Sequence, residues 1–254
     1  MAGFPGIEGT TVVVTGPTQG IGRAIVHGFA DNGAAKIVGI SRSITDDHKV
    51  AAEARERGAE FIALQCDFAK RAENLSLAER VHEAVGDVNI LVNNAGTVAF
   101  SPSDEYPMEM WDEVLEVNLH GPFILTRDVG RRMIENGGGK IVFNASLASF
   151  QGNVGVISYT VSKSGIAGVI RGLGVEWAPH NVNVNGIAPG YTTTDLTAPV
   201  HQSPEEFAKV LERTPANRWM DPEDLVGSIL FLASSASRSI CGQIIPVDGG
   251  WMVR

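Results

Sequence analysis

The stretch Thr11-Val-Val-Val-Thr15-Gly16-Pro-Thr-Gln19-Gly20-Ile21-Gly22-Arg23 decides the fold. It opens with an apolar run typical of a buried strand, and residues 21 to about 32 have the apolar period of a helix. The glycines between them carry no side chain, so backbone N–H groups and the positive end of the helix dipole can approach an anionic pyrophosphate. A plain strand-to-helix turn is the alternative interpretation of this stretch taken alone.

A second apolar run, residues 36–40, ends at Ser41 and Arg42, about 20 residues beyond Gly22. A dinucleotide-binding unit contacts the adenosine ribose at this distance, where a carboxylate would accept a hydrogen bond from the 2′-hydroxyl of NAD. Arg42 would instead pair with a 2′-phosphate. The sequence therefore favours NADP(H) as the cofactor and leaves NAD(H) open.

Apolar runs of strand length alternate with helical stretches along the rest of the chain, at residues 61–64, 89–93, 140–144, 182–187 and 243–247. This alternation predicts an α/β protein with a seven-stranded, mostly parallel, doubly wound sheet and helices on both faces. With 254 residues, 44% of them hydrophobic, we expect a single-domain Rossmann fold over residues 1–254.

Ligands of such sheets bind at the carboxyl ends of the strands. The residues that follow the predicted strands are Gly16, then Ser41 and Arg42, Asp67, Asn94 to Gly96, Ser146, and Pro189 with Gly190. One edge of the sheet is therefore the predicted site. Residues 189 to about 214 form an insertion at this edge, with a short amphipathic helix over 205–211, and we expect it to act as a substrate lid.

Tyr159 and Lys163 lie four positions apart, so they share one face of a helix, and Ser146 lies thirteen positions before Tyr159. A phenol with a pKa near ~10 is a poor base at neutral pH, but a neighbouring ammonium favours the phenolate. The three residues predict a site that gives and takes protons. Taken alone, Ser146 is better explained as the cap of a helix after the fifth strand, since serine is a common N-cap.

The composition excludes several classes of partner. A net charge of −9 argues against nucleic acid and anionic membranes. Cys66 and Cys241 are isolated, and the six histidines show no metal-binding spacing, so neither a disulfide nor a metal site is predicted. No run approaches the ~18 apolar residues of a membrane span, and the N-terminus lacks a secretion signal. We therefore expect a cytoplasmic protein that acts on a small molecule.

Taken together, these motifs resemble those of the short-chain dehydrogenase/reductase family over nearly the whole chain. The resemblance is carried by residues 15–22, 93–96, Asn118, Ser146, Tyr159, Lys163, Pro189, Gly190, Thr194 and 248–251. It implies a hydride-transferring enzyme on a secondary alcohol or ketone, with Tyr159 as general acid/base and Ser146 donating to the substrate oxygen. Lys163 would hold the nicotinamide ribose and lower the tyrosine pKa.

The same resemblance implies that Asn118 anchors a water that returns a proton to Lys163. Alternatively, Asn118 ends a helical segment over 112–118 that restarts at His120-Gly121-Pro122. A redox-silent, cofactor-binding regulatory protein is the alternative of another class, but such a protein would be expected to lose Tyr159 or Lys163.

The implied cofactor contacts are Gly16, Gln19, Gly20, Ile21, Gly22, Ser41, Arg42, Asp67, Phe68, Asn94, Ala95, Gly96, Tyr159, Lys163, Pro189, Gly190, Thr192 and Thr194. Many NADP-using relatives place Lys or Arg where this chain has Gln19, so Arg42 is the one usual cation present. Asp67 would reach the adenine amino group, cap the next helix, or do both. The implied substrate contacts are Ser146, Gln151, Tyr159 and Tyr191, and the implied assembly is a homotetramer.

The second half shows a narrower similarity, to the gluconate and 2-dehydro-3-deoxygluconate 5-dehydrogenase group. However, residues 97–100 and 152–157, which should line the substrate pocket, contain no Lys or Arg, and a buried carboxylate without a cation is costly. The sequence therefore predicts a neutral substrate, with a sugar acid as the alternative. Arg218, in the lid region, is the residue that would support the alternative.

Overall fold

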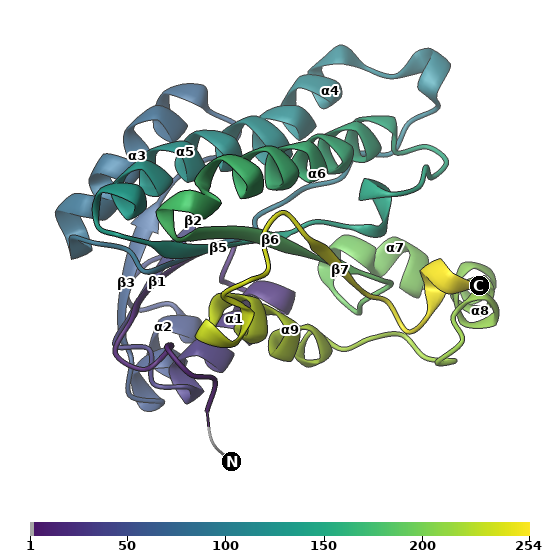
Figure 1. Ribbon diagram of the computed structural model, residues 1–254. Coiled ribbons are helices and arrows are strands. Elements are labelled where there is room, and N and C mark those ends of the chain that lie inside the picture. The colour runs from purple at the N-terminus through teal and green to yellow at the C-terminus, as the bar shows by residue number, and fades with distance from the viewer. Residues whose placement is uncertain (1–2) are drawn as a thin grey trace.

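The computed structural model describes residues 3–254, and its centre is one seven-stranded parallel sheet in the order β3-β2-β1-β4-β5-β6-β7 (Figure 1). The strands are β1 (Thr11–Thr15), β2 (Lys36–Ser41), β3 (Glu60–Gln65), β4 (Ile90–Asn93), β5 (Gly139–Asn144), β6 (Val182–Pro189) and β7 (Ile244–Val247). Each predicted strand is present, and every pairing is parallel. The predicted α/β doubly wound fold is confirmed.

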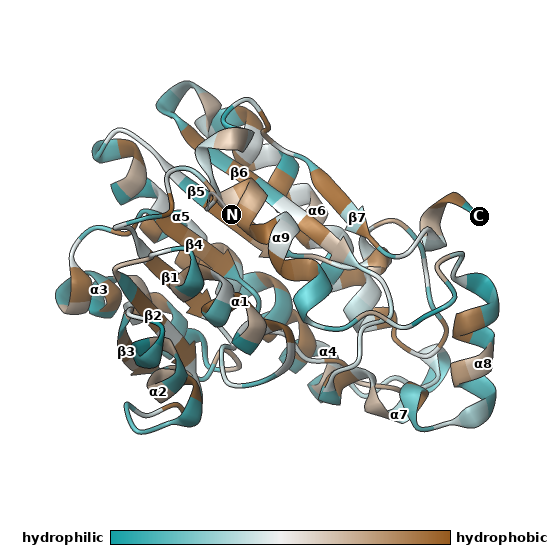
Figure 2. Ribbon diagram, turned by 90° about the horizontal axis from the view of Figure 1, so that it is seen from below, coloured by the Kyte–Doolittle hydropathy of each residue, from teal (hydrophilic) through white to brown (hydrophobic). Residues whose placement is uncertain are grey.

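Helices cover both faces of the sheet (Figure 1). One layer contains α1 (Gly20–Asp31), α2 (Lys49–Glu56) and α9 (Glu223–Ala233), and the other contains α3 (Arg71–Val85), α5 (Gly121–Glu135) and α6 (Ile157–Trp177). α4 (Met108–Leu115) precedes α5. In Figure 2 hydrophobic segments gather on the sheet and on the helices that pack against it. No helix within residues 3–254 is long and apolar enough to cross a membrane.

The sheet order changes direction between β1 and β4, because the chain crosses from β3 on one edge back to β4 beside β1. In doubly wound sheets a crevice for ligands opens at the carboxyl ends of the strands at such a point. The turns after β1 and β4 meet there, since Asn94 and Ala95 donate their backbone N–H groups to Thr15 Oγ1, both at 2.9 Å. The fold thus places the glycine-rich turn in this crevice.

The segment after β6 forms a separate small unit at the carboxyl edge. It contains α7 (Ala198–His201) and α8 (Pro204–Arg213), which lie beside the C-terminus and away from the main helix layers (Figure 1). α8 begins at Ser203, whose hydroxyl accepts from the Glu206 N–H, and Pro204 suits its first turn. Its apolar side packs with Trp219 and Trp251 in a cluster distinct from the two main cores.

Candidate active site

The turn between β1 and α1 forms a cradle that only glycine permits. Gly16 has a φ of +65°, and a Cβ on Gly22 would stand 1.8 Å from the Gly16 carbonyl oxygen. No side chain caps the N-terminus of α1, so its first N–H groups keep their hydrogen-bonding capacity for an anion. Thr194 closes the other side, because its methyl group lies 3.2 Å from a Cβ placed on Gly20.

Asn94 fixes the shape of this cradle. Its Nδ2 donates to the carbonyl oxygens of Thr15 and Gly16, both at 3.0 Å, and its Oδ1 accepts from Asn144 Nδ2 at 2.9 Å. Sequence reasoning did not select Thr15 or Asn144. Both are polar residues at the carboxyl ends of strands, and that position alone could have indicated from the sequence that they belong to the site.

The end of β2 holds a polar atom without a partner. Ser41 Oγ is buried and makes no hydrogen bond to any of the described residues, and Arg42 beside it is exposed and forms no ion pair with residues 3–254. Gln19 is exposed, and Phe68 is buried. An adenosine ribose with a 2′-phosphate fits these groups, since it would bring acceptors to both residues.

Asp67 caps the turn that precedes α3, because its Oδ1 accepts from the Ala69 N–H at 3.1 Å. This leaves its other carboxylate oxygen near Lys70 Nζ, at 3.8 Å. Asp67 therefore caps this turn and not α3 itself, whose N-cap residue is Lys70. Gly190 lies where β6 meets β7, and a Cβ there would stand 2.8 Å from the Cα of Asp248.

The first turns of α6 carry Tyr159 and Lys163. Lys163 is buried, its Nζ donates to the Asn144 carbonyl oxygen at 2.8 Å, and it lies 5.6 Å from the centroid of the Tyr159 ring. The side chain of Asn144 also donates to Asn94, so the backbone and side chain of this one residue connect the lysine to the glycine cradle. The predicted proton-transfer residues and the predicted phosphate site therefore share one hydrogen-bonded frame.

Burial governs the charges of this pair. It raises the pKa of the Tyr159 phenol above its usual value, although a hydrogen bond from Ser146 partly opposes the shift. Burial also lowers the pKa of Lys163 to about 8. The sequence predicts that the lysine lowers the tyrosine pKa, whereas the structure makes desolvation of the phenol the largest effect on that pKa.

Ser146 has the capping role considered for it from the sequence, and its contact with the substrate oxygen stays a prediction. Its Oγ accepts from the Ala148 N–H at 3.1 Å, which caps the short helical turn Leu147–Ser149. The same hydroxyl lies in hydrogen-bonding contact with Tyr159. A capping serine and a serine that contacts the phenol are compatible here.

Asn118 does not end a helical segment. It lies in a π-helical turn, Glu116–His120, that joins α4 to α5 without a break. Its Nδ2 and Oδ1 bond to the backbone of Thr97, both at 2.8 Å, and Nδ2 also contacts Ser162 Oγ at 3.2 Å. Ser162 donates to the Tyr159 carbonyl oxygen at 2.8 Å, so Asn118 ties the loop after β4 to α6.

A cavity of about 200 Å³ lies between α8 and the loop after Ser146. Its lining combines polar and aromatic side chains: Gln151, Gly152, Asn153, Tyr191, Glu206, Lys209, Val210, Arg213 and Trp251. Two of these, Gln151 and Tyr191, are predicted substrate contacts. The Arg213 guanidinium lies 4.1 Å from the centroid of the Trp251 ring and donates to Gln151 Oε1 at 3.3 Å.

Two apolar residues that were expected to line the substrate pocket are exposed, and the expected cation lies outside the cavity. Val154 is 93% exposed and Phe100 is 55% exposed, so neither forms a buried floor. Arg218 pairs with Asp224 through two hydrogen bonds, with Nη2 at 2.9 Å from Oδ1, and it does not line the cavity. The cations that line the cavity are instead Lys209 and Arg213, and neither was predicted from the sequence.

No group of three or more potential metal ligands occurs in the part of the chain that the structure describes.

Residues 10–205 match the family model of the short chain dehydrogenase. The chain belongs to this family. Its members are named for hydride-transfer enzymes, so the predicted oxidoreductase class is confirmed and the alternative of a redox-silent regulatory protein is set aside.

Three relatives illustrate the similarity. A 2-dehydro-3-deoxy-D-gluconate 5-dehydrogenase from Pseudoalteromonas atlantica is 42% identical and covers 98% of both chains. A solved structure from Beutenbergia cavernae, proposed to be an NAD(P)-dependent gluconate 5-dehydrogenase and holding NADP at low occupancy, is 43% identical, with a TM-score of 0.92 over 97% of this chain and 98% of that one. A gluconate 5-dehydrogenase from Burkholderia cenocepacia in complex with NADP and tartrate is 32% identical, with a TM-score of 0.92 over 97% and 96%.

Proposed function

We propose that this protein is an NADP(H)-dependent dehydrogenase that interconverts a secondary alcohol and a ketone on a small sugar acid. The observation that carries the proposal is the frame that joins Lys163, Asn144 and Asn94 to the glycine cradle at Gly16. This frame holds a proton-transfer pair beside a dinucleotide site, which is the arrangement that reversible alcohol oxidation requires.

Each residue of the pair has a distinct task in this proposal. NADP(H), when bound, supplies or accepts the hydride. Tyr159 donates a proton to the substrate oxygen in reduction and removes it in oxidation, and Ser146 orients that oxygen. Lys163 stabilises the phenolate and holds the ribose. Asn118, bonded to Thr97 and Ser162, fixes the π-helical turn next to the pair and supports the path by which the proton returns.

The preference for NADP(H) rests on the end of β2. Arg42 has no ion-pair partner in residues 3–254. The Ser41 hydroxyl is buried and has no hydrogen-bond partner among the same residues. Both would bind a 2′-phosphate, whereas no carboxylate is present there for a 2′-hydroxyl. The solved relatives that hold NADP support the same choice.

The sugar-acid class rests on two independent supports. The relatives described above are named as gluconate or 2-dehydro-3-deoxy-D-gluconate 5-dehydrogenases, one of them as a proposal, and another was solved with tartrate, itself a hydroxy acid. In this chain the cavity next to the loop that follows Ser146 is lined by Arg213, a cation of a kind that the loops after β4 and β5 lack. The neutral substrate remains a prediction of the loop sequences alone.

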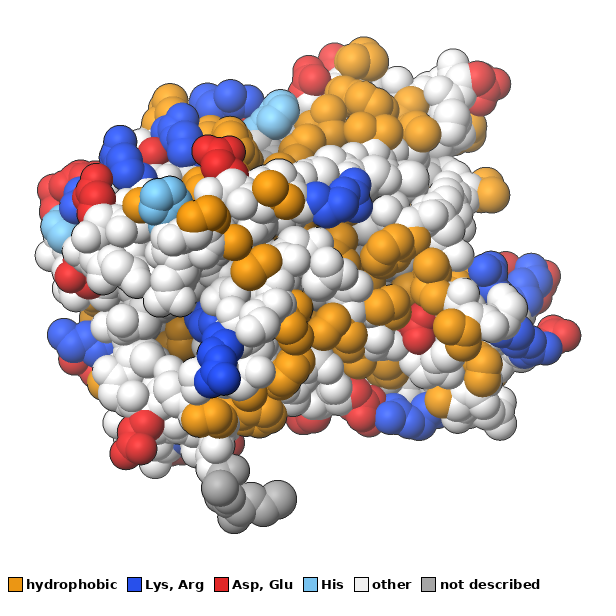
Figure 3. Space-filling view, in the orientation of Figure 1, with side chains coloured by type: hydrophobic (Ala, Val, Ile, Leu, Met, Phe, Trp, Pro, Cys, Tyr) orange, Lys and Arg blue, Asp and Glu red, His pale blue; other side chains and the backbone are white. Residues whose placement is uncertain are grey.

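The segment at residues 189–214 is proposed to act as the substrate lid of a single domain over residues 1–254. We further propose a cytoplasmic homotetramer. Hydrophobic side chains gather on the surface over α4 (Figure 3), and Met108, Met110, Phe123 and Val161 on α4 to α6 are exposed. Burying such a patch between subunits would remove apolar surface from water.

The direct test of the proton-transfer role replaces Tyr159 with Phe, which keeps the ring and removes the exchangeable proton. We expect turnover of the acid substrate to fall by ~10² or more, while the dissociation constant for NADPH changes little. Steady-state rates and cofactor fluorescence titration measure the two quantities. Turnover close to that of the wild type would show that another group transfers the proton.

A further inference from the structure

The cavity between α8 and the loop after Ser146 is lined by Arg213, a cation with no carboxylate partner in residues 3–254. Arg213 is exposed and forms no ion pair with any residue from 3 to 254. Its hydrogen bond is to the neutral side-chain oxygen of Gln151, at 3.3 Å. A guanidinium that lines a cavity with only an amide partner retains its capacity for a bidentate anion.

The other charges of the cavity are already matched. Lys209 Nζ lies 2.8 Å from a carboxylate oxygen of both Glu205 and Glu206. Glu206 also lines the cavity, but its pairing with Lys209 reduces its repulsion of an incoming anion. Arg213 is therefore the group in this cavity from which an anionic ligand gains most.

The position of Arg213 is set by its surroundings. Its guanidinium lies 4.1 Å from the centroid of the Trp251 ring, and Trp251 is buried. Asp248 holds the turn that carries this tryptophan, because its oxygens accept from the Gly250 and Met252 N–H groups, both at 2.9 Å. A cation seated on an indole face loses less freedom when it binds a ligand than an unrestrained surface arginine.

We propose that Arg213 is the specificity-determining residue of the lid, which binds the carboxylate of the substrate while the reacting carbon lies at Tyr159. The inference rests on the proposed sugar-acid activity and adds the residue that recognises the acid. Gln151, released from Arg213 or sharing it, would orient the same end of the substrate. The cavity of about 200 Å³ is smaller than the roughly 300–1,000 Å³ of sites for drug-sized ligands, so it suits a short-chain acid.

The test compares gluconate with gluconamide, which carries a neutral amide in place of the carboxylate. Arg213→Met keeps an apolar stem against Trp251 and removes the charge. We expect it to lower the ratio of kcat/KM for gluconate over gluconamide by about tenfold or more, mainly through KM. Arg213→Lys should restore part of the ratio. Arg218→Met, which removes a charge that is already paired with Asp224, should leave the ratio within about twofold.

Binding to the Tyr159→Phe protein loaded with NADP⁺, measured by calorimetry, gives the same comparison without turnover. Loss of the preference for gluconate in the Arg213→Met variant supports the role even if neither compound is oxidised, in which case only the proposed activity fails. An unchanged preference in that variant overturns the inference. An absence of any preference in the protein with Arg213 intact also overturns it.

Discussion

Tyr159 and Lys163 share a buried site in which each side chain is pushed toward its uncharged form. Burial raises the pKa of the phenol and lowers that of the ammonium to about 8, so at pH 7 the pair consists of a neutral phenol and a mostly charged lysine. A neutral phenol is the form that donates a proton, and it is therefore ready for ketone reduction. Alcohol oxidation needs the phenolate, which is the minor form.

We accordingly expect opposite pH dependences in the two directions. The oxidative kcat/KM should rise with pH as the phenol loses its proton, and the reductive kcat/KM should fall over the same range. Because the two groups interact, the apparent pKa belongs to the pair. Lys163→Met should move the oxidative profile to higher pH, since it removes the charge that favours the phenolate. A flat oxidative profile, with a full isotope effect on hydride transfer, would contradict this account.

Arg42 should decide the choice of cofactor. A charge-assisted contact to a 2′-phosphate contributes ~1.5 to 3 kcal/mol, or roughly ten- to over a hundredfold in affinity. Arg42→Ala should raise KM for NADPH by that order and leave KM for NADH nearly unchanged. Ser41→Asp should shift the preference toward NADH, because a carboxylate repels the phosphate. Equal wild-type efficiency with both cofactors would show that Arg42 does not read the phosphate.

Residue spacing predicts part of this site and misses another part for a physical reason. Helical spacing places Lys163 one turn from Tyr159, and that arrangement needs no tertiary information. Spacing cannot tell which arginine lines the cavity, because Arg213 and Arg218 lie only five positions apart in the sequence. Arg218 is hydrogen-bonded to Asp224, whereas Arg213 packs over the Trp251 ring. Tertiary packing determines both partners.

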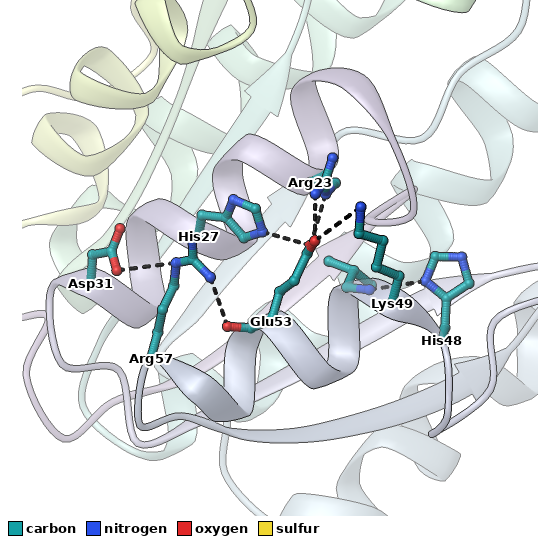
Figure 4. A network of polar contacts seen from close by, with 8 residues as sticks. Arg23, His27, Asp31, His48, Lys49, Glu53 and Arg57 are labelled. Atoms are coloured by element: carbon teal, nitrogen blue, oxygen red, sulfur yellow. Dashed lines mark hydrogen bonds and ion pairs between the residues drawn. The ribbon is translucent and has the colours of Figure 1, made fainter.

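A network of polar contacts joins α1 to α2 (Figure 4). Glu53 on α2 accepts from Arg23 Nε at 2.7 Å and lies 2.9 Å from His27 Nε2, both on α1. Lys49 lies 3.7 Å from the same carboxylate. Since α1 begins at the glycine cradle and the loop before α2 carries Arg42, this network fixes the two parts of the proposed cofactor site relative to each other.

The same network should contribute to stability. The hydrogen bond from Arg23 lowers the pKa of Glu53 to about 2, so its contribution is full above pH ~4.5 and is lost as the pH falls through about 2. Glu53→Gln should reduce the unfolding free energy by about 1–2 kcal/mol at neutral pH, after discounting for solvent screening, and by less at pH ~3.5. Denaturant titration at both pH values measures this.

Glu60→Gln is the matched control, because Glu60 makes a single exposed contact of 3.6 Å with Lys36. Its effect should stay within about 0.5 kcal/mol at either pH. A Glu53→Gln effect equal to this control would show that the network adds no stability.

The regular elements follow closely from the sequence, and the irregular one does not. Apolar runs that alternate with helical stretches locate the strands, because buried parallel strands are continuously apolar. The helix expected at 205–211 extends to Pro204–Arg213, since proline and serine define its start. The π-helical turn Glu116–His120 has no such local signal, because the Thr97 backbone and Ser162 that hold Asn118 come from distant parts of the chain.

At the scale of the whole molecule, the sheet brings residues from six strand ends to one edge, and the proposed lid adds the one feature that we expect to distinguish substrates. Enzymes with different substrates share such a sheet and glycine cradle. These features therefore define the reaction class and not the substrate. Substrate choice is proposed to depend on α8 and its contacts with Trp251. Fold prediction from sequence is therefore stronger here than substrate prediction.

The most direct test of the central claim is steady-state oxidation by the purified protein, followed as formation of reduced nicotinamide. Gluconate and 2-dehydro-3-deoxy-D-gluconate are compared with a neutral cyclic alcohol, each with NADP⁺ and with NAD⁺. We expect one of the acids with NADP⁺ to give the highest kcat/KM, with about tenfold or greater preference over NAD⁺. Higher efficiency with the neutral alcohol, or no nicotinamide reduction with any of these compounds, would contradict the account.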